Sequence, residues 1–296
     1  MVRVGSTPSP TRLIINADDF GISRGVNIGI IEAAEAGVVT SASLIVNLPE
    51  FADALDRALA CPTLSIGLHL NFTLGRPLTA ATSLTRRSSG EFYTMPAFLA
   101  RASLGLLDPS DIARECLAQI DRMIEAGFPP THLDSHRHVH AHPAVFPVVA
   151  RAAASRGVFQ LRVPSEPLWI NASDWRATLK KAGLFISTRL SLRAGAHDPA
   201  IHFVGVSLQG GTLFASRLFA LIPQLPAGTT ELMTHPGYAD ASLAEQDSYT
   251  LERVTELRAL TSREFRELLV RYGVTLTSFG HRTSIVPRES QLAQHH

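Results

Sequence analysis

The segment HLDSHRHVHAHP, residues 132–143, contains five of the twelve histidines of the chain and one aspartate. Imidazole and carboxylate groups are common protein ligands of zinc and related divalent cations. A histidine-rich tract can also be a disordered metal-binding sequence or a solvated loop, and composition alone leaves both open. Residues two apart share a face of an extended chain, so four side chains would point the same way if a strand continued through this segment: Asp134, His136, His138 and His140.

Apolar runs elsewhere in the chain end in residues of the same chemical types. These runs are RLIINA (12–17), LSIGLHL (64–70) and TELMT (230–234). Near their ends stand Asp18 and Asp19, then His69, then His235. A catalytic metal site commonly has three protein ligands and one open position for water, and two histidines with one carboxylate are a standard set. Asp19, His69 and His136 would supply that set from three strand ends.

Buried strands alternate with helices along most of the chain, which is typical of a parallel sheet. Strands are predicted at 12–17, 39–47, 64–70, 131–135, 160–164, 202–206, 230–234 and 274–279. Helices are predicted at 23–37, 49–60, 109–126, 143–156, 169–193 and 216–222, and as a hairpin over 248–272. Residues 71–108 interrupt this order with prolines, glycines and serine-threonine clusters, and we expect a long functional loop there.

An open doubly wound sheet and a closed barrel both fit this alternation. The barrel is favoured because it gathers all the carboxyl ends of the strands at one mouth, where its active site lies. We therefore predict an α/β fold, a single-domain distorted (β/α) TIM-like barrel with parallel strands and an inserted long loop. The barrel domain is expected at 12–285, after a disordered lead at 1–11 and before a flexible tail at 286–296.

The composition excludes several classes of protein. The chain has 27 Lys and Arg against 26 Asp and Glu, and 45% of its 296 residues are hydrophobic. This near-neutral balance gives no reason to expect nucleic-acid binding, and no apolar run is long enough for a membrane span. Cys61 and Cys116 form no CxxC motif, so we interpret both as small buried residues. The N-terminus lacks the apolar segment of a signal peptide, which predicts a cytoplasmic location; His295 and His296 are left out as a tag remnant or tail.

Four motifs carry a resemblance to a known family. They are LIINADDFGIS (13–23), GLHLNFT (67–73), THLDSHRHVH (131–140) and THPG (234–237). In this order they resemble the signature motifs of the YdjC-like carbohydrate deacetylases, a family that includes chitooligosaccharide deacetylases and a branch associated with hopanoid glycolipid biosynthesis. The resemblance covers roughly residues 12–281. It implies a distorted barrel, one divalent metal ion, and hydrolysis of an N-acetyl group from an amino sugar.

The resemblance also assigns roles to particular residues. It implies that Asp19, His69 and His136 are metal ligands, that Asp18 is the general base, and that His235 protonates the leaving amine. Spacing alone does not determine which aspartate binds the metal and which accepts a proton. Adjacent aspartates in a regular strand face opposite sides, so both can serve only if the backbone turns there, and Gly21 offers that freedom.

Five further residues are predicted to bind substrate or to support the site: Asp134, His138, His140, Asn71 and Arg162. Asp134 would orient a ligand histidine or accept a backbone hydrogen bond at its strand end. His138 and His140 would contact sugar hydroxyls or bond within the mouth. Arg162 would bind an anionic substrate group or pair with Glu166. Trp169 and Trp175 would stack on a sugar or serve a structural role.

Two other readings remain open at this point. A glycosidase could use a carboxylate pair such as Asp18 and Glu231, but His69, His136 and His235 would then have no role. A non-catalytic metal-binding or sugar-binding protein would bind without turnover. For the deacetylase we expect one divalent ion, magnesium or zinc, with manganese or cobalt as alternatives. The expected partners are an N-acetylated saccharide or glycolipid and a second copy of the chain in a homodimer.

Overall fold

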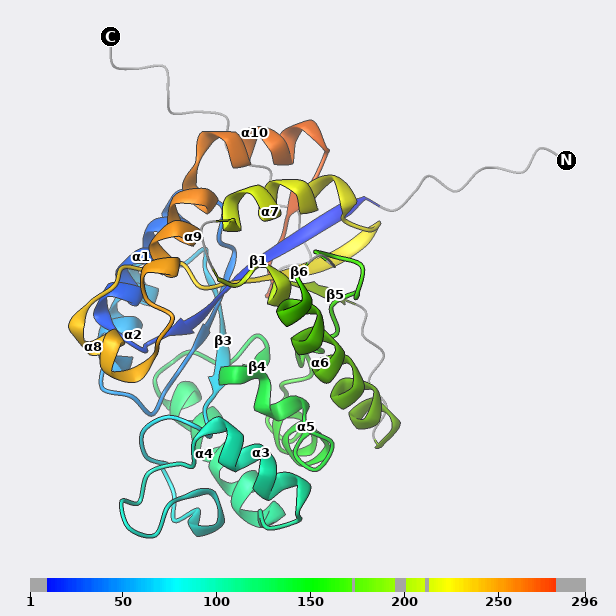
Figure 1. Cartoon of the computed structure of the whole chain (residues 1–296). Coiled ribbons are helices and arrows are strands. Elements are labelled where there is room, and N and C mark those ends of the chain that lie inside the picture. Colours follow the sequence, from blue (N-terminus) through cyan, green and yellow to red (C-terminus); the bar gives the residue numbers. More distant parts are fainter. Residues whose placement is uncertain (1–9, 172–173, 195–200, 211–212, 281–296) are drawn as a thin grey trace, which may run out of the picture.

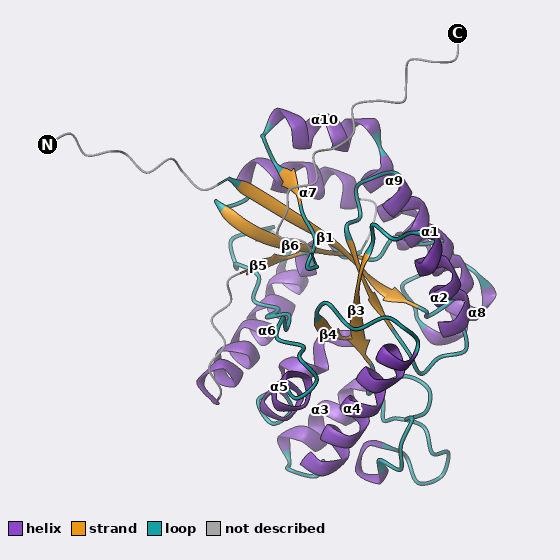
Figure 2. Cartoon of the chain, turned by 180° about the vertical axis from the view of Figure 1, so that it is seen from behind, coloured by secondary structure: helices purple, strands orange, loops and turns teal. Residues whose placement is uncertain are grey.

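This computed structural model describes residues 10–171, 174–194, 201–210 and 213–280. The strands of this part form one seven-stranded sheet, and all ladders between them are parallel. The sheet is curled, and the helices lie around its outside (Figure 1, Figure 2). The predicted distorted TIM-like barrel is confirmed.

The longest strand, β1, lies in the middle of the sheet. The strands are β1 (Thr11–Phe20), β2 (Ser41–Leu44), β3 (Ser65–Leu70), β4 (Leu133–Ser135), β5 (Ile201–Val204), β6 (Gly228–Thr234) and β7 (Thr275–Leu276). Their order is β4-β3-β2-β1-β6-β5, and β7 pairs with the start of β1. Residues 13–20 of β1 are all buried, as expected for a strand with helices outside and packed side chains inside.

Ten helices are present among the described residues. They are α1 (Arg24–Glu35), α2 (Phe51–Ala60), α3 (Met95–Ser103), α4 (Pro109–Glu125), α5 (Phe146–Ala154), α6 (Trp175–Ala194), α7 (Phe214–Leu221), α8 (Ala241–Gln246), α9 (Leu251–Thr261) and α10 (Arg263–Arg271). The predicted ends of α1 are confirmed: the Ser23 hydroxyl accepts a bond from the Val26 amide, and Gly37 beyond the helix has φ 77°. None of the helices in the described ranges combines the length and apolarity needed to cross a bilayer.

The strand register determines which polar residues lie side by side at the carboxyl ends of the strands. Ala17 of β1 pairs with Thr234 of β6, so Asp18 and His235 follow at the same level. His69 of β3 pairs with Asp134 of β4, so these two side chains are also neighbours. The backbone pairing alone therefore places these four residues at the mouth of the barrel.

The barrel is open on one side, where the sequence predicted a strand at 160–164. That segment makes one parallel bridge, Leu133 with Leu161. The amide of Arg162 donates to the Leu133 carbonyl at 2.9 Å, after which the segment leaves the sheet. Pro164 follows closely and has no amide hydrogen to continue a ladder. The sheet therefore has seven strands rather than the eight expected.

Several predicted boundaries are too long. The strand expected at 39–47 is reduced to β2, that at 131–135 to β4, and that at 274–279 to β7. The helical hairpin breaks at Ser262, whose hydroxyl caps α10. The loop at 71–108 contains α3 and a short 3₁₀ turn, η1 (Thr82–Leu84). The lead and tail lie outside the described residues except for Pro10 and Thr11, and Thr11 already begins β1.

Candidate active site

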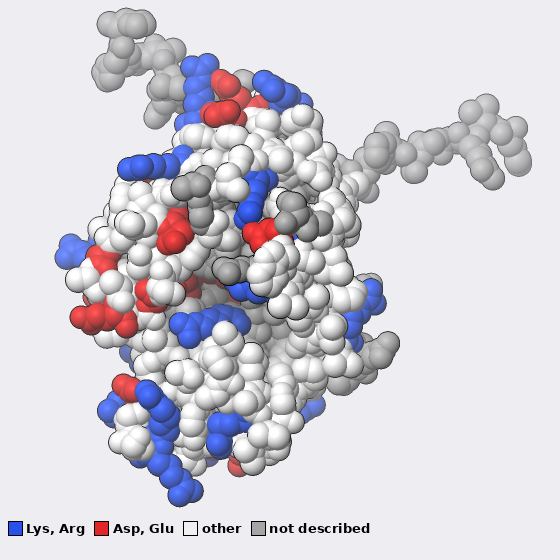
Figure 3. Space-filling model, viewed as in Figure 1, with Lys and Arg blue, Asp and Glu red and all other residues white. Residues whose placement is uncertain are grey.

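A cavity of about 670 Å³ opens at the carboxyl ends of the strands. Figure 3 shows the molecule hollowed near the middle of this face, with acidic and basic side chains beside the hollow. The cavity brings together all five residues for which the sequence predicted a catalytic or metal-binding role. Its polar lining includes Asp18, Asp19, His69, His136, His138, Lys180, Gln209, His235, Tyr249 and Arg253, and its apolar lining includes Met95, Leu99, Leu184 and Val206.

The backbone turns sharply at the two adjacent aspartates. The register of β1 against β2 shifts between Ala17 and Phe20, and Asp19 has φ 67°. Gly21, at φ 91°, completes the turn, and a Cβ there would lie 2.7 Å from the Ile45 carbonyl oxygen. This turn lets both carboxylates line the same cavity, as the sequence argument required. Gly21 was expected to supply the freedom, but Asp19 itself also adopts a left-handed conformation.

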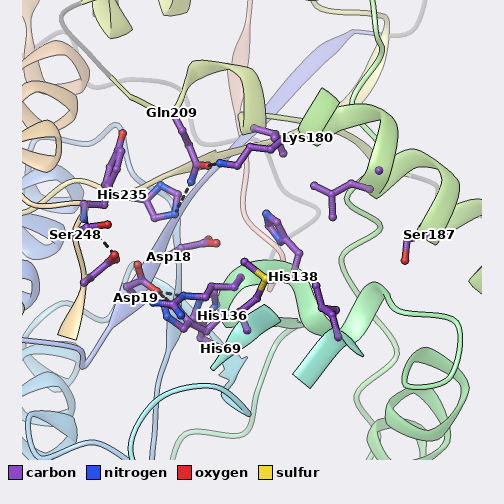
Figure 4. A pocket seen from close by; sticks show the side chains of 18 of the residues that line it. Asp18, Asp19, His69, His136, His138, Lys180, Ser187, Gln209, His235 and Ser248 are labelled. Atoms are coloured by element: carbon purple, nitrogen blue, oxygen red, sulfur yellow. Dashed lines mark hydrogen bonds and ion pairs between the residues drawn. The ribbon is translucent and has the colours of Figure 1, made fainter. Parts of the chain in front are cut away.

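Asp19, His69 and His136 converge at the bottom of the cavity (Figure 4). One oxygen of Asp19, Oδ1, lies 2.8 Å from His136 Nδ1 and 3.1 Å from His69 Nε2. One ligand atom from each residue lies within 4.8 Å of the others. All three side chains are buried. Residues from β1, β3 and the segment after β4 are thus gathered as the sequence predicted.

The hydrogen bonds around this group fit a divalent cation. His69 Nδ1 is 2.6 Å from Asp134 Oδ1, which fixes the ring so that Nε2 faces Asp19. His136 Nε2 is buried and has no hydrogen-bond partner among the described residues. A buried nitrogen without a partner is costly unless something binds it. Two imidazoles, one carboxylate and a carboxylate behind a ligand histidine form a donor set that suits zinc and related cations.

A second group, Asp18, His69 and Asp134, is equally compact. Arg162 lies between its two carboxylates, 2.6 Å from Asp18 Oδ2 and 2.6 Å from Asp134 Oδ2. A guanidinium in that position already pairs with both carboxylates and would repel a metal ion. The first group, Asp19, His69 and His136, is therefore the candidate metal site.

Asp18 is held in place by both of its oxygens. Arg162 donates from Nη1 to Oδ2 at 2.6 Å and from Nη2 to Oδ1 at 2.7 Å. Asn16 donates to Oδ1 at 2.8 Å. A bidentate bond from a planar guanidinium leaves a carboxylate little rotational freedom. Asp18 is therefore a fixed acceptor at the edge of the cavity.

The bottom of the cavity favours positive charge. Burial opposes ionisation of Asp19, but Arg253 and His136 outweigh it and hold the pKa of Asp19 well below its usual value. Burial also opposes ionisation of His69 and so lowers its pKa, but Asp134 and Asp19 outweigh this effect and raise the pKa to about 10. A cation bound here would take the place of that proton.

His235 lines the same cavity as Asp19, His69 and His136 (Figure 4). Its backbone amide donates to Glu256 Oε2 at 2.6 Å, and its Nδ1 lies 3.9 Å from Glu256 Oε1. Its Nε2 lies 3.3 Å from Gln209 Nε2. The ring packs edge-on against Tyr249. An imidazole fixed at the wall with a carboxylate behind it is placed to act as a general acid or base.

Comparison with known proteins agrees with this geometry. The family model described as YdjC-like protein matches residues 12–271. The chain belongs to the YdjC-like family. It is 37% identical over 268 residues to a carbohydrate deacetylase of Brevibacillus brevis, covering 90% of this chain and 98% of that protein. It is also 37% identical over 273 residues to a chitooligosaccharide deacetylase of Citrobacter koseri, covering 90% and 97%.

Among solved structures, one from Enterococcus faecalis V583 has a TM-score of 0.70 and 27% sequence identity. It covers 92% of this chain and 98% of its own, and cellobiose-phosphate cleavage is provisionally assigned to it. These matches extend over nearly the whole described fold, and the family match at residues 12–271 includes all four motifs.

The five histidines of the 132–143 segment lie in different places because the strand ends at Ser135. The irregular 3₁₀ segment that follows, η2 (His136–Ala141), has positive φ at Arg137 and His138. The condition for a common face, a strand that continues through this segment, is therefore not met. His136 and His138 line the cavity, together with His142 at the rim, whereas His132 and His140 are buried elsewhere.

The two buried histidines serve the packing of the sheet. His132 Nε2 lies 3.1 Å from Ser43 Oγ, and its ring stacks on Phe279. His140 bonds through Nδ1 to Ser135 and through Nε2 to the Arg162 carbonyl. Burial lowers the pKa of His132 and of His140 to about 4, so both are neutral at physiological pH.

Other predicted residues lie beneath the cavity or away from it. Asn71 is fully buried and bonds to Asn47 and to the Leu74 carbonyl, which closes the start of the loop after β3. The expected pairing of Arg162 with Glu166 is wrong, because Glu166 bonds to Ser207 and Arg162 to the carboxylates around Asp18. Trp169 and Trp175 are exposed and do not line the cavity. The two cysteines are buried and free, as expected.

Sequence reasoning missed Arg253, Glu256, Tyr249, Gln209 and Lys180. Arg253 and Glu256 are buried in α9, where Arg253 Nη2 donates to Asp19 Oδ2 at 2.7 Å. In sequence, α9 reads as a polar surface helix, ERVTELR, and nothing in its periodicity indicates two buried charges. Gln209 and Lys180 come from segments with no recognisable motif, so only the fold brings them to the cavity.

Proposed function

We propose that this protein is a metal-dependent N-deacetylase that removes the acetyl group from an amino sugar in an oligosaccharide or glycolipid. The observation that carries the proposal is the convergence of Asp19, His69 and His136 in a cavity that Asp18 and His235 also line. Relatives that are carbohydrate and chitooligosaccharide deacetylases, alike over about nine-tenths of the chain, support the same reaction.

Hydrolysis of an acetamido group needs a nucleophile, a stabilised oxyanion and a protonated leaving nitrogen. In the proposed reaction Asp18 accepts a proton from the water that attacks the acetyl carbon. The bond between this carbon and the sugar nitrogen then breaks, and His235 donates a proton to the nitrogen. The products are a free amine and acetic acid, which keeps the second hydrogen of the water and then ionises to acetate. A positioned acid or base of this kind contributes roughly 10²–10⁴-fold to the rate.

Asp19, His69 and His136 would hold the metal ion, and their donor set suits zinc, with magnesium, manganese and cobalt as alternatives. When bound, a divalent cation would polarise the acetyl carbonyl and increase the acidity of water in the cavity. Asp134 would orient the His69 ring through the 2.6 Å contact with Nδ1. His138 lines the cavity and is proposed to contact the sugar.

The glycosidase alternative is weaker. It needs two carboxylates at the scissile bond, and Glu231 does not line the cavity. Its Oε1 instead accepts a hydrogen bond from Arg162 Nε at 2.7 Å, and its side chain is buried. The histidines would also have no role in that reaction.

The deciding experiment is acetate release from a panel of N-acetylated saccharides and N-acetylated glycolipids. We expect release from at least one of them, loss of release on treatment with a chelator, and recovery when zinc, magnesium, manganese or cobalt is added back. Reducing sugar measured in the same reactions tests the glycosidase alternative. Acetate release that withstands complete metal removal would contradict metal dependence, and saccharide binding without release would favour a non-catalytic protein.

Location and assembly are part of the proposal as well. A cytoplasmic location is proposed, and the family resemblance supports a homodimer. Cell fractionation tests the first, and light scattering on the purified protein tests the second. A monomer at micromolar concentration would contradict the dimer.

A further inference from the structure

A chain of three polar side chains from separate parts of the fold reaches His235. Lys180 on α6 places its ammonium nitrogen 3.1 Å from Gln209 Oε1. Gln209 follows the 3₁₀ turn η3 (Val206–Leu208), and its Nε2 lies 3.3 Å from His235 Nε2. All three residues line the cavity, and Figure 4 shows Gln209 between the other two.

The chemistry of the lysine fixes the direction of this chain. An ammonium group has only donors, so the atom of Gln209 that faces Lys180 must be the amide oxygen. The NH₂ group of the same amide must then face the imidazole. Since an NH₂ group can only donate, His235 Nε2 must accept, and a proton on Nε2 would set two donors against each other.

The other ring nitrogen of His235 has the opposite surroundings. Nδ1 is buried, lies 3.9 Å from a carboxylate oxygen of Glu256, and has no hydrogen-bond partner among the described residues. A hydrogen on Nδ1 would point to negative charge, whereas a lone pair there would face it. Both ends of the ring therefore favour the same tautomer.

We propose that Lys180 is a positioning residue that acts through Gln209 and holds resting His235 with its proton on Nδ1 and its Nε2 unprotonated. Without the lysine, the amide of Gln209 can rotate by 180° and present its oxygen to the imidazole. His235 would then favour a proton on Nε2. The ammonium of Lys180 selects between these two arrangements.

The catalytic consequence rests on the proposed function. An unprotonated Nε2 cannot donate, so His235 must first take up a proton there. The imidazolium then keeps its Nδ1 hydrogen toward Glu256 and gives the Nε2 proton to the leaving nitrogen. Each turnover takes one proton from solvent onto Nε2 and returns to solvent the proton that Asp18 accepted from water. Lys180 thus affects the step at the leaving group rather than substrate binding.

The test is the protonation state of each ring nitrogen, read by NMR on the full-length protein with ¹⁵N-labelled histidine. The twelve histidines of the chain require assignment, and the signal lost in His235→Gln identifies this ring. We expect Nδ1 protonated and Nε2 unprotonated in the wild type. In Gln209→Glu, where a carboxylate oxygen replaces the NH₂ group, we expect Nε2 to become protonated. In Lys180→Met we expect a mixture of the two tautomers.

Two controls separate this effect from a general loss of structure. Lys180→Arg keeps a donor for Gln209 and should preserve the wild-type spectrum. Arg189→Met removes a cation from α6 that packs over Phe185, and it should leave the His235 signals unchanged. A wild-type ring with its proton on Nε2, or an unchanged ring in Lys180→Met, would overturn the proposal.

Kinetics provide a second readout. Lys180→Met lets the rotated Gln209 oxygen accept from the Nε2 hydrogen that donation requires, so kcat for acetate release should rise by up to about tenfold with KM unchanged, and Lys180→Arg should keep the wild-type kcat. A change in KM alone would contradict the positioning role. If the tautomer is as stated but His235→Gln keeps full activity, the proposed proton donor is wrong while the positioning by Lys180 stands.

Discussion

Two buried arginines stand behind the adjacent aspartates, and they hold them differently. Arg162 donates to both oxygens of Asp18, at 2.6 and 2.7 Å. Arg253 contacts only Oδ2 of Asp19, at 2.7 Å, and shares the same Nη2 with Asp247. Both guanidinium groups have no exposed surface. Arg162 therefore contacts both oxygens of Asp18, whereas Arg253 leaves Oδ1 of Asp19 to other partners.

The difference explains how two neighbours in sequence can serve different roles. Asp19 keeps Oδ1 for the histidines, so it can act as a ligand while Arg253 neutralises the rest of its charge. Asp18 has no oxygen without an arginine contact, but it lies at the cavity with a fixed orientation, which suits an acceptor of protons. Arg162 also contacts Asp134 and Glu231, so it links Asp18 to the carboxylate behind His69.

The strongest test of this comparison exchanges each aspartate for asparagine in turn. An amide cannot accept the proton of water, so Asp18→Asn should lower acetate release by at least about 10²-fold while the metal stays bound. Asp19→Asn removes a ligand and should lose the metal as well as the activity. Metal content and acetate release are measured on the same samples, and circular dichroism checks folding. If Asp18→Asn retained activity, the assignment of the base would be wrong.

The next test removes each guanidinium. Arg162→Met would leave three buried carboxylates facing one another without a counter-charge, which costs roughly 3–5 kcal/mol of unfolding free energy. Arg253→Met would unpair Asp19 and Asp247, and since Asp247 is 16% exposed, we expect a loss smaller by about 1–2 kcal/mol. Urea unfolding monitored by tryptophan fluorescence measures both variants. Equal losses would contradict the view that Arg162 carries the larger share of buried charge.

The fold could be predicted from sequence because its signals are local. The apolar run before Asp18, the capping serine and glycine around α1, and the alternation of strands with helices each indicate an element without reference to the rest of the chain. The convergence of Asp19, His69 and His136 could be predicted because parallel strands bring their carboxyl ends together. Register then places His69 beside Asp134, which spacing alone could not show.

What could not be predicted depends on contacts distant in sequence. Arg253 meets Asp19 across 234 positions of the chain, and Arg162 meets Asp18 across 144. The course of the chain after Ser135 could not be predicted, because Arg137 and His138 adopt left-handed conformations that the periodicity of polar residues does not indicate. The open side of the barrel could not be predicted either. The segment at 160–164 forms a single bridge at Leu161, and its five-residue sequence pattern looks the same as that of a full strand.

A smaller effect is expected at the turn that separates the two carboxylates. Gly21→Ala would place a Cβ 2.7 Å from the Ile45 carbonyl oxygen at a positive φ, and we expect a loss of roughly 2–3 kcal/mol with reduced activity. Gly37→Ala is the matched control, since Gly37 also has a positive φ but nothing lies within 4 Å, so about 1 kcal/mol is expected without a change in kcat. Equal losses in the two variants would show that contact with Ile45 does not fix the turn.

The smallest loss of unfolding free energy is expected at an ion pair near the surface. On α2, Arg57 Nε donates to Asp53 Oδ2 at 2.8 Å, and both side chains are about a quarter exposed. The hydrogen bond from Arg57 lowers the pKa of Asp53. Since the pKa is lower in the folded state than the value of about 3.9 in the unfolded state, the pair stabilises the protein above that value, and this stabilisation is lost as the pH falls through the folded pKa.

Asp53→Asn should therefore lower the unfolding free energy by about 0.5–1 kcal/mol at pH 7, and the difference from wild type should shrink below about pH 4. Asp56→Asn on the same helix is the control, because Asp56 is exposed and forms no ion pair with other described residues. Urea unfolding between pH 3 and pH 7 gives both curves. The buried arginine variants should keep several times this penalty at pH 7, because their carboxylates have no water to replace the lost partner. If Asp53→Asn lowered the unfolding free energy as much as Arg162→Met, burial would not be the property that distinguishes the two sites.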